Sequence, residues 1–466
     1  MKRLRAASGV KEAILARRAI PQSSRHLSTA LLQSRTPRPL IPTSSLQHLV
    51  LPTNPATRHA SSTPGSSALQ KTPLYDLHVA NGGKMVPFGG FHMPVQYADL
   101  SVSASHHFTR SHASLFDVSH MVQHHFSGPG ATAFLEKVTP ASISQLGTHN
   151  GGLSTLLWPF TGGIVDDTII TRLGPQLFYV VTNAGCREKD LKYFEEQLAD
   201  FKKSGGQDVE WEVLNGQGLI ALQGPLSVEI LGGLLVTPDE VDLQKLYFGQ
   251  SQFIKIKLLG DKVSSPLLVS RGGYTGEDGF EISIPGHETV AVTEALLQTA
   301  TSEKLQLAGL GARDSLRLEA GMCLYGHDLD DSTTPVEAAL GWVIGKDRRV
   351  AGGFHGEKVI LAQLTPKSKG GSGVERRRIG LIVEGAPARE GAEIVDENGE
   401  KIGNITSGCP SPTLKKECRY GIHQRWVPQI WDKRGGRCQR QEAQGPGHKD
   451  AFRSKQVLER RSSGMI

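Results

Sequence analysis

The sequence predicts a multi-domain α+β fold with a small all-β domain toward its C-terminal end. The first observation is size, because 466 residues of which 38% are hydrophobic can bury a large core in two or three domains. The second is an alternation of strand-like and helix-like segments from Thr72 to about Leu364. The third is a polar, glycine-rich segment at 366–376 followed by short β-rich runs, which indicates a linker and a separate β domain from residue 377.

The first 68 residues have the composition of a mitochondrial transit peptide. MKRLRAASGVKEAILARRAI is rich in arginine and nearly free of acids, can form a basic amphipathic helix, and precedes a Ser/Thr/Pro-rich run. A disordered basic arm is the alternative interpretation. We therefore expect residues 1–68 to be a disordered targeting segment that is cleaved between Arg58 and Lys71. The mature protein is then expected in the mitochondrial matrix.

The positive charge of the chain belongs to its two ends. Residues 1–70 hold ten Lys/Arg and one acid, and residues 417–466 hold eleven and five, so their charges are +9 and +6 and the body between them carries −9. The body has no basic stripe with interleaved aromatic residues, which argues against nucleic-acid binding. The sequence contains no run of about 18 uncharged apolar residues, so we expect no membrane span.

Hydrophobic spacing predicts the elements of the body in chain order. Leu191, Phe194, Leu198 and Phe201 recur at intervals of three or four residues, as on one face of a helix. The predicted strands are 177–184, 219–225 and 280–286, and the predicted helices are 186–203, 288–300 and about 312–320.

Two adjacent acids interrupt a strand-like run, TGGIVDDTIIT, at 161–171. Because neighbouring side chains on a strand point to opposite faces, Asp166 and Asp167 cannot share one site. We expect one to face solvent or a strand edge and the other to point, with Val165 and Ile169, toward a covered face. A carboxylate there needs a partner, either an arginine of the fold or a ligand with N–H groups.

The histidine-rich segment at 106–125 suggests a metal site only superficially. It contains no H-E-x-x-H motif, and adjacent histidines diverge on a helix or a strand, so we expect no metal. The five cysteines are scattered and form no C-x-x-C pair. Within this region LFDVSHM (115–121) predicts a turn between apolar anchors, with Asp117 and Ser119 as its polar residues.

Two later segments have residues suited to a flat or anionic ligand. In RGGYTGEDGFEISI (271–284) a glycine-rich turn leads into a strand, so Tyr274 could cover a ring and Glu281 could face it; a hairpin with a surface glutamate is the alternative. In the helix near 312–320, Arg313 and Arg317 lie four residues apart and could anchor a ligand carboxylate or pair with Asp314 and Glu319.

Taken together, these motifs and others resemble a known family. In chain order they are TPLYDLHVANGGKMVPFGGFHMPVQY, LFDVSHM, GGIVDDTIIT, VTNAGCREKDL, ALQGP, GYTGEDGFEIS, GLGARDSLRLEAGMCLYGHDLDD and TSGCPSPTLKK. Over about residues 72–416 the sequence resembles the aminomethyltransferases of the glycine cleavage system, the T-proteins, in a mitochondrial form.

The resemblance implies a folate-binding architecture of several domains, at 72–365, with a C-terminal β-barrel. It implies transfer of the methylene of an aminomethyl group on the dihydrolipoyl arm of the H-protein to tetrahydrofolate, which releases ammonia and forms 5,10-methylenetetrahydrofolate. No metal is implied.

The resemblance also assigns roles to five residues. Asp167, rather than Asp166, matches the catalytic aspartate of the family. Glu281 matches a pterin-binding glutamate, Tyr274 a folate-contacting tyrosine, Arg313 an arginine that meets the glutamyl carboxylate, and Met121 a folate-lining methionine.

After TSGCPSPTLKK the resemblance stops. A one-base shift of suitable codons for ECRYGIHQRWVPQIWD spells NVAMGYINDGFHKSG, which looks like the family's continuation. We therefore predict that residues 417–466 are a frameshifted, disordered tail, that the β domain at 377–416 lacks its closing strands, and that a C-terminal aromatic folate contact is missing. An inactive folate-binding protein of the same fold is the resulting alternative.

Two related families fit less well. Sarcosine and dimethylglycine dehydrogenases carry a glycine-rich FAD fingerprint that this sequence lacks, and the folate-binding iron–sulfur assembly factors carry a K-G-C-Y-x-G-Q-E motif that is absent here.

Overall fold

The computed structural model describes residues 68–383, 388–396, 398–414, 416–423, 430–432 and 437–441. The predicted targeting segment, 1–68, thus lies outside the described residues except for its last position. Within the described part, no helix has the length and apolar character needed to cross a membrane.

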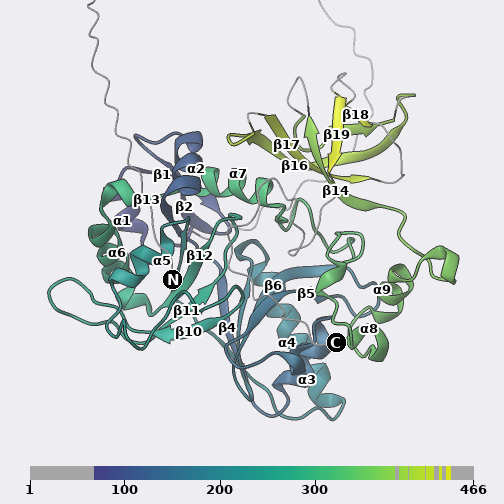
Figure 1. Cartoon of the computed structure of the whole chain (residues 1–466). Coiled ribbons are helices and arrows are strands. Elements are labelled where there is room, and N and C mark those ends of the chain that lie inside the picture. The colour runs from purple at the N-terminus through teal and green to yellow at the C-terminus, as the bar shows by residue number, and fades with distance from the viewer. Residues whose placement is uncertain are drawn as a thin grey trace, which may run out of the picture. The chain divides into compact units, whose positions relative to one another are not determined.

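A five-stranded antiparallel sheet carries the two adjacent acids (Figure 1). Helices α3 and α4 lie along it, and Phe126, Phe178 and Phe194 are fully buried between the sheet and these helices. Burying each such ring stabilises the fold by about 1.5–3 kcal/mol. Across the sheet the strands are β5 (Gly151–Leu157), β6 (Ile164–Gly174), β7 (Leu177–Thr182), β4 (Val122–Ser127) and β8 (Glu210–Val213), and the helices are α3 (Ala131–Val138) and α4 (Arg187–Lys203).

A six-stranded sheet forms the second layered unit. Its strands are antiparallel except for the last pair, and helices α5 and α6 cover the face that buries Leu222, Phe280 and Leu296. In order across the sheet, the strands are β10 (Ser251–Ile254), β11 (Leu267–Arg271), β12 (Gly279–Ile284), β9 (Gly218–Gln223), β3 (Ala113–Asp117) and β13 (Leu305–Leu307). The helices are α5 (Ser227–Gly233) and α6 (Thr289–Lys304).

Shorter elements connect these sheets. Helix α7 approaches β2 so closely that a Cβ on Gly309 would lie 2.5 Å from the backbone of Val95, and α7 ends where Gly321 takes a left-handed conformation at φ 85°. The remaining helices are α1 (Tyr75–Ala80), α2 (Val102–Ser111), α7 (Leu310–Ala320), α8 (Arg348–Ala351) and α9 (Glu357–Leu364), and the hairpin strands are β1 (Gly83–Phe88) and β2 (Phe91–Tyr97). The 3₁₀ helices are η1 (Ile143–Gln145), η2 (Ala184–Cys186), η3 (Gly286–Glu288), η4 (Gly341–Val343) and η5 (Lys367–Lys369).

The C-terminal unit is a closed barrel, so the prediction of an incomplete barrel is wrong. Its strands pair in the order β14 (Arg377–Val383), β17 (Lys416–His423), β16 (Lys401–Ser411), β15 (Glu393–Val395), β18 (Ile430–Asp432) and β19 (Arg437–Gln441).

The last three strands of the barrel come from the segment that we expected to be disordered. Strand pairing uses backbone N–H and C=O groups, which almost any sequence supplies. The letters KECRYGIH (416–423) also place Cys, Tyr and Ile at every second position, a pattern that the sequence analysis missed. Residues 424–429, 433–436 and 442–466 lie outside the described residues. The frameshift itself stays a prediction, which the transcript across the codons for 415–418 would test.

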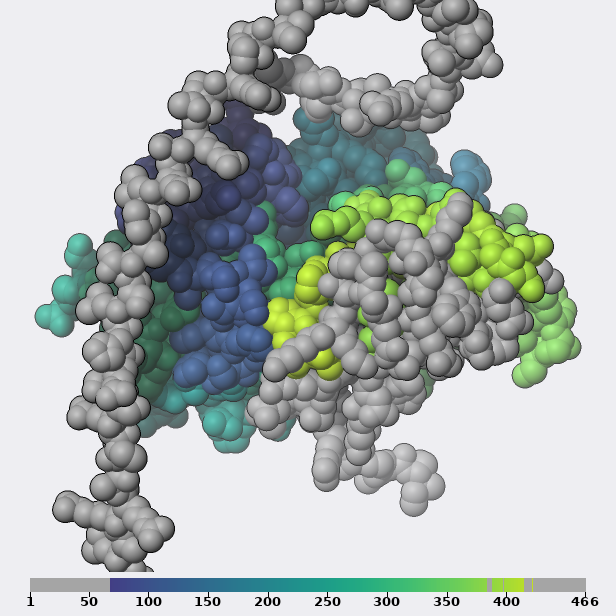
Figure 2. Space-filling view, turned by 90° about the horizontal axis from the view of Figure 1, so that it is seen from above, coloured from purple at the N-terminus to yellow at the C-terminus, as the bar shows by residue number. Residues whose placement is uncertain are grey.

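Glu319, near the end of α7, joins three parts of the chain. It is 4% exposed, accepts a 2.9 Å hydrogen bond from Arg110 on α2, and accepts a 2.5 Å bond from Ser411 at the end of β16. His106 on α2 reaches Thr413, which follows β16, at 3.0 Å. Figure 2 shows the surface around α2 beside that of the barrel. These contacts fix the barrel against α2 and α7.

We predict that Glu319→Gln lowers the free energy of unfolding by about 1–3 kcal/mol at pH 7, because buried Arg110 then keeps only Glu277 of its two anionic partners. Burial acts to raise the pKa of Glu319, but hydrogen bonds from His106 and Ser411, together with nearby charges, lower it from 4.5 to about 2. A lowered folded pKa gives stability that is present above pH 4.5 and lost as pH falls toward 2.

In Glu319→Gln the free energy of unfolding should therefore fall less steeply with decreasing pH than in the parent chain. Urea unfolding between pH 3 and 7 measures this. Exposed Glu188→Gln on α4 is the control. An unfolding free energy equal to that of the parent chain would contradict the role of Glu319.

Candidate active site

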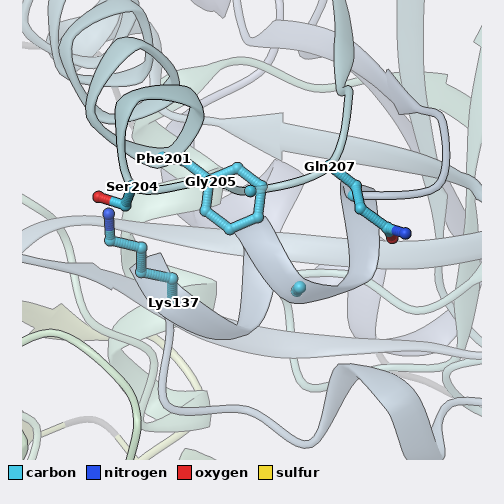
Figure 3. A pocket seen from close by; sticks show the side chains of 8 residues that line it. Lys137, Phe201, Ser204, Gly205 and Gln207 are labelled. Carbon is cyan, nitrogen blue, oxygen red and sulfur yellow. The ribbon is translucent and has the colours of Figure 1, made fainter.

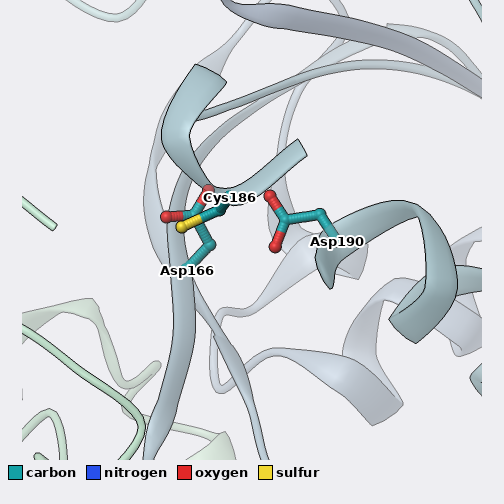
Figure 4. A group of neighbouring side chains, drawn as sticks. All are labelled: Asp166, Cys186 and Asp190. Atoms are coloured by element: carbon teal, nitrogen blue, oxygen red, sulfur yellow. The ribbon is translucent and has the colours of Figure 1, made fainter. Parts of the chain in front are cut away.

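The two adjacent acids of β6 lie on different sides of the sheet, as the strand pattern predicts. Asp166 is fully buried beside Cys186 of η2 and Asp190 of α4 (Figure 4). Asp167 is half-buried and lies within electrostatic reach of Tyr274 and Asp328. The two side chains therefore lie in separate environments.

The expected burial of these two faces was wrong. Asp166, which we expected at solvent or a strand edge, is 0% exposed because η2 and α4 cover its side of β6. An irregularity in β6 turns Val165 into the core beneath α3 and α4, whereas Ile169, on the side of Asp167, is 37% exposed. Alternation along a strand predicts to which face of the sheet a side chain points, but it does not predict which helix covers that face.

One asparagine connects the two acids. The Nδ2 group of Asn183, which follows β7, donates to Oδ1 of Asp166 and to Oδ1 of Asp167, both at 2.9 Å. The backbone N–H of Asn183 donates to Oδ2 of Asp166 at 2.7 Å. Asn183 thereby fixes the orientation of both carboxylates, although the sequence analysis did not single it out.

Asp167 is set up to exchange a proton near neutral pH. Burial, and secondly the negative charge of Asp166, raise the pKa of Asp167 from 3.8 to about 7, while the hydrogen bond from Asn183 opposes the shift. A carboxyl group with a pKa near ambient pH is suited to general acid–base chemistry.

Glu281, Arg313 and Tyr274 form a second cluster. Glu281 lies on β12, Arg313 in the first turn of α7, and Tyr274 between β11 and β12. The guanidinium carbon of Arg313 is 4.7 Å from the centre of the Tyr274 ring, and the Tyr274 hydroxyl donates to the carbonyl of Cys323. Tyr274 thus links the arginine to the segment that follows α7.

Burial perturbs both charged members of this cluster. It raises the pKa of Glu281 and lowers the pKa of Arg313, and in each case the opposite charge of the other residue acts against the shift. Nη1 of Arg313 is buried yet has no hydrogen-bond partner among the described residues. An arginine N–H left in this condition is costly unless a ligand meets it.

Met121 and His120 complete the surroundings. Met121 packs against the cluster that contains Phe116 and Tyr179. His120 is 3% exposed, its ring lies 5.5 Å from that of Phe88, and its Nδ1 has no hydrogen-bond partner in the described part of the chain. Burial, with the cation of Arg313, lowers the pKa of His120 from 6.5 to about 4, so its imidazole is neutral at pH 7.

The structure brings the five expected residues into one region. Asp167 and Arg313 both act electrostatically on Tyr274, and Arg313 acts on Glu281. Met121 packs against the cluster that contains Ala312 and Leu316 of α7. Arg317, the other arginine of the same helix, binds Asp328 at 2.7 Å and Asp314 at 2.8 Å. Arg317 therefore pairs with acids of the fold, which was the alternative to binding a ligand carboxylate.

Other polar groups that the sequence suggested are used for packing. His106 meets Ser315 at 2.7 Å, whereas His124 is buried beside Phe194 and Trp211. Asp166, Cys186 and Asp190 place a donor atom each within 4.8 Å of one another. The ammonium of Lys189 lies close enough to act on Asp190 and Cys186, which disfavours a cation there.

A hollow of about 490 Å³ lies at another place, between α3 and the end of α4 (Figure 3). Lys137, Phe201, Ser204 and Gln207 line it together with glycines, and none of the five expected residues takes part. It contains no pair of groups suited to acid–base chemistry, so the candidate site remains the region of Asp167.

Comparison with known proteins gives the family. Residues 74–348 match the GCVT N-terminal domain, and residues 376–438 match the glycine cleavage T-protein C-terminal barrel domain. The second match continues past residue 416, where we expected the resemblance to end. A crystal structure of glycine cleavage system aminomethyltransferase T from Bartonella henselae superposes with a TM-score of 0.71 at 32% identity, covering 84% of this chain and 100% of that chain.

Curated relatives agree. The chain is 47% identical over 376 residues to a probable mitochondrial aminomethyltransferase of Schizosaccharomyces pombe, covering 80% of this chain and 91% of the relative. It is 48% identical to the mitochondrial aminomethyltransferase of Pisum sativum, with 76% and 82% covered, and 46% identical to that of Mus musculus, with the same shares covered.

The fold and the site thus define a GCVT-type transferase with a C-terminal barrel. The chain belongs to the glycine cleavage T-protein family. The predicted fold class and the predicted aminomethyltransferase activity are confirmed, and the alternative of an inactive folate-binding protein is not supported. The names of these relatives agree with the expected mitochondrial location.

We predict that the neutral state of buried His120 makes the fold sensitive to acid. Its folded pKa of about 4 lies below the ordinary 6.5, so the unfolded chain takes up the proton first. This contribution to stability is complete above pH 6.5 and is lost as pH falls toward 4, at up to about 1.4 kcal/mol per pH unit.

His120→Phe should flatten the fall in unfolding free energy between pH 6.5 and 4, measured by urea unfolding at several pH values. His287→Gln, whose side chain is 81% exposed, is the control. The same slope in His120→Phe as in the parent chain would show that His120 titrates normally.

Proposed function

We propose that the chain transfers the methylene of an aminomethyl group carried on the dihydrolipoyl arm of the H-protein to tetrahydrofolate, with release of ammonia and formation of 5,10-methylenetetrahydrofolate. Asp167 is the catalytic residue, and Met121, Tyr274, Glu281 and Arg313 bind the folate. We place the reaction in the mitochondrial matrix, where the basic, acid-poor segment at 1–68 would direct the chain.

One observation carries the folate proposal. Nη1 of Arg313 and Nδ1 of His120 are buried in the same region without hydrogen-bond partners among the described residues. Buried polar atoms of this kind are normally satisfied. A flat ligand with several polar atoms and a carboxylate would satisfy them, and the Tyr274 ring offers it an apolar face.

The protein groups are suited to the roles that we assign. Tetrahydrofolate would supply the nitrogen that takes up the methylene carbon. Asp167, whose Oδ1 is held by Asn183, presents its other oxygen to accept the proton that this nitrogen loses. A negative charge fixed at this point also stabilises positive charge that develops nearby. Glu281 accepts hydrogen bonds from ring N–H groups, and Arg313 meets a ligand carboxylate.

We predict that Asp167→Asn lowers the turnover number by about two decades or more, on the order of 3 kcal/mol, because an amide cannot accept the proton. Tetrahydrofolate affinity should change little, since the amide keeps the size and the hydrogen bond of the carboxylate. The measurement is ammonia release that depends on both the aminomethylated carrier and tetrahydrofolate, with fluorescence titration for binding.

Two further variants complete this test. Glu281→Gln should weaken tetrahydrofolate binding by about tenfold and leave saturated turnover less affected, because it removes one charge-assisted hydrogen bond. Asp239→Asn, at an exposed position, should match the parent chain. Near-normal turnover of Asp167→Asn would reject the catalytic role of Asp167.

A further inference from the structure

The fully buried cluster behind Asp167 has no role in the proposed function, although two of its members are acids. Asp166, Cys186 and Asp190 converge from β6, η2 and α4 (Figure 4). Asp166 and Asp190 are each 0% exposed. Two buried carboxylates this close together disfavour each other's ionisation, and the nearby charge of Lys189 offsets this only in part.

The donors around the two carboxyl groups differ. Asp166 receives the backbone N–H and the Nδ2 group of Asn183 at 2.7 and 2.9 Å, so it is satisfied as an anion. Asp190 has no such amide donors among the described residues, and the Thr182 hydroxyl is the neutral group that favours its anion. As a carboxylate Asp190 would be a buried charge only partly compensated by Thr182 and Lys189, whereas as a neutral acid it can donate its proton to Asp166.

We infer that Asp190 is a protonated acid that donates to Asp166, and that this pair acts through Asn183 as a positioning unit for Asp167. In this arrangement Asp166 accepts hydrogen bonds from Asp190 on one side and from Asn183 on the other. Asp166 thereby fixes the Asn183 amide, which donates to Oδ1 of Asp167. The inference rests on the proposed function, since it concerns the residue assigned to proton transfer. It makes Asn183, Asp166 and Asp190 positioning residues.

The titration behaviour agrees with this assignment. Burial, followed by the charge of Asp166, raises the pKa of Asp190 from 3.8 to about 10. Burial also raises the pKa of Asp166, while hydrogen bonds from Asp190 and Asn183 oppose that shift. The other groups that act on the pair or on Asp167 from packed elements are Cys186, Lys189, Tyr193, Tyr274, Cys323, Tyr325 and Asp328.

The first experiment needs no substrate. At pH 8 we expect the full chain to show the infrared carbonyl band of a protonated carboxyl group, and Asp190→Asn to lose it. Asp200→Asn, exposed on the same helix, should keep the band. A parent chain without the band, or a band that survives in Asp190→Asn, would overturn the inference. So would stoichiometric binding of Zn²⁺ that Asp190→Asn abolishes, because the acids would then be ligands.

The second experiment tests the connection to Asp167. Asp190→Leu, which cannot donate, should lower turnover by about tenfold with little change in tetrahydrofolate affinity, and Asp190→Asn, which can donate, should lose less. Asp166→Asn should move the acid limb of the turnover profile to lower pH by about one unit, because the charge that raises the pKa of Asp167 is gone.

The outcomes separate the inference from the proposed function. If Asp167→Asn is inactive but Asp190→Leu and Asp166→Asn keep the turnover and pH profile of the parent chain, the positioning unit is rejected and the function stands. If Asp167→Asn is fully active, the function itself fails, while the infrared result still decides the state of Asp190.

Discussion

The site depends on one amide that serves two acids. Asp166 and Asp167 follow one another on β6 and therefore enter different environments, one fully buried and the other half-buried. Asn183, which directly follows β7, donates to both carboxylates. Without this donor the chain would hold two poorly compensated charges next to each other. The same hydrogen bonds keep Asp167 in a fixed orientation, which is the condition for proton transfer to a bound partner.

Much of the fold follows from the sequence because hydrophobic spacing is local. The helix predicted at 186–203 is α4, and the strands predicted at 177–184, 219–225 and 280–286 are β7, β9 and β12. The opposite directions of Asp166 and Asp167 also follow from strand geometry. Local patterns already pointed to Tyr274, Glu281 and Arg313, and the resemblance to a family added Met121 and the choice of Asp167 over Asp166.

The parts that could not be predicted depend on packing between distant segments. Asn183 and Asp190 lie in the motif VTNAGCREKDL, but no local pattern tells that they meet Asp166, because the meeting depends on the register of β6 with β7 and on the placement of α4. The pairing of Arg110 with Glu319, rather than of Arg313 or Arg317, has the same origin. The closed barrel was missed because the alternation in 416–423 was overlooked and the segment was interpreted as a frameshifted tail.

The barrel supports the site through contacts with α7 and with Asp328, and none of the five expected site residues lies in it. Its strand β16 is tied to α7 through Ser411 and Glu319, and Thr406 on the same strand donates a 2.5 Å hydrogen bond to Asp328. Asp328 in turn binds Arg317 of α7, the helix that carries Arg313. Closure of the barrel also leaves no unpaired strand edge among its described strands.

The central claim is that folate binds where β6, β12 and α7 converge. Amide hydrogen exchange of the full chain with and without tetrahydrofolate tests it most directly. We expect slower exchange at the ends of these three elements that carry Asp167, Glu281 and Arg313, and no change around the hollow lined by Lys137 and Phe201. Protection at that hollow, with none at β6, β12 and α7, would contradict the claim.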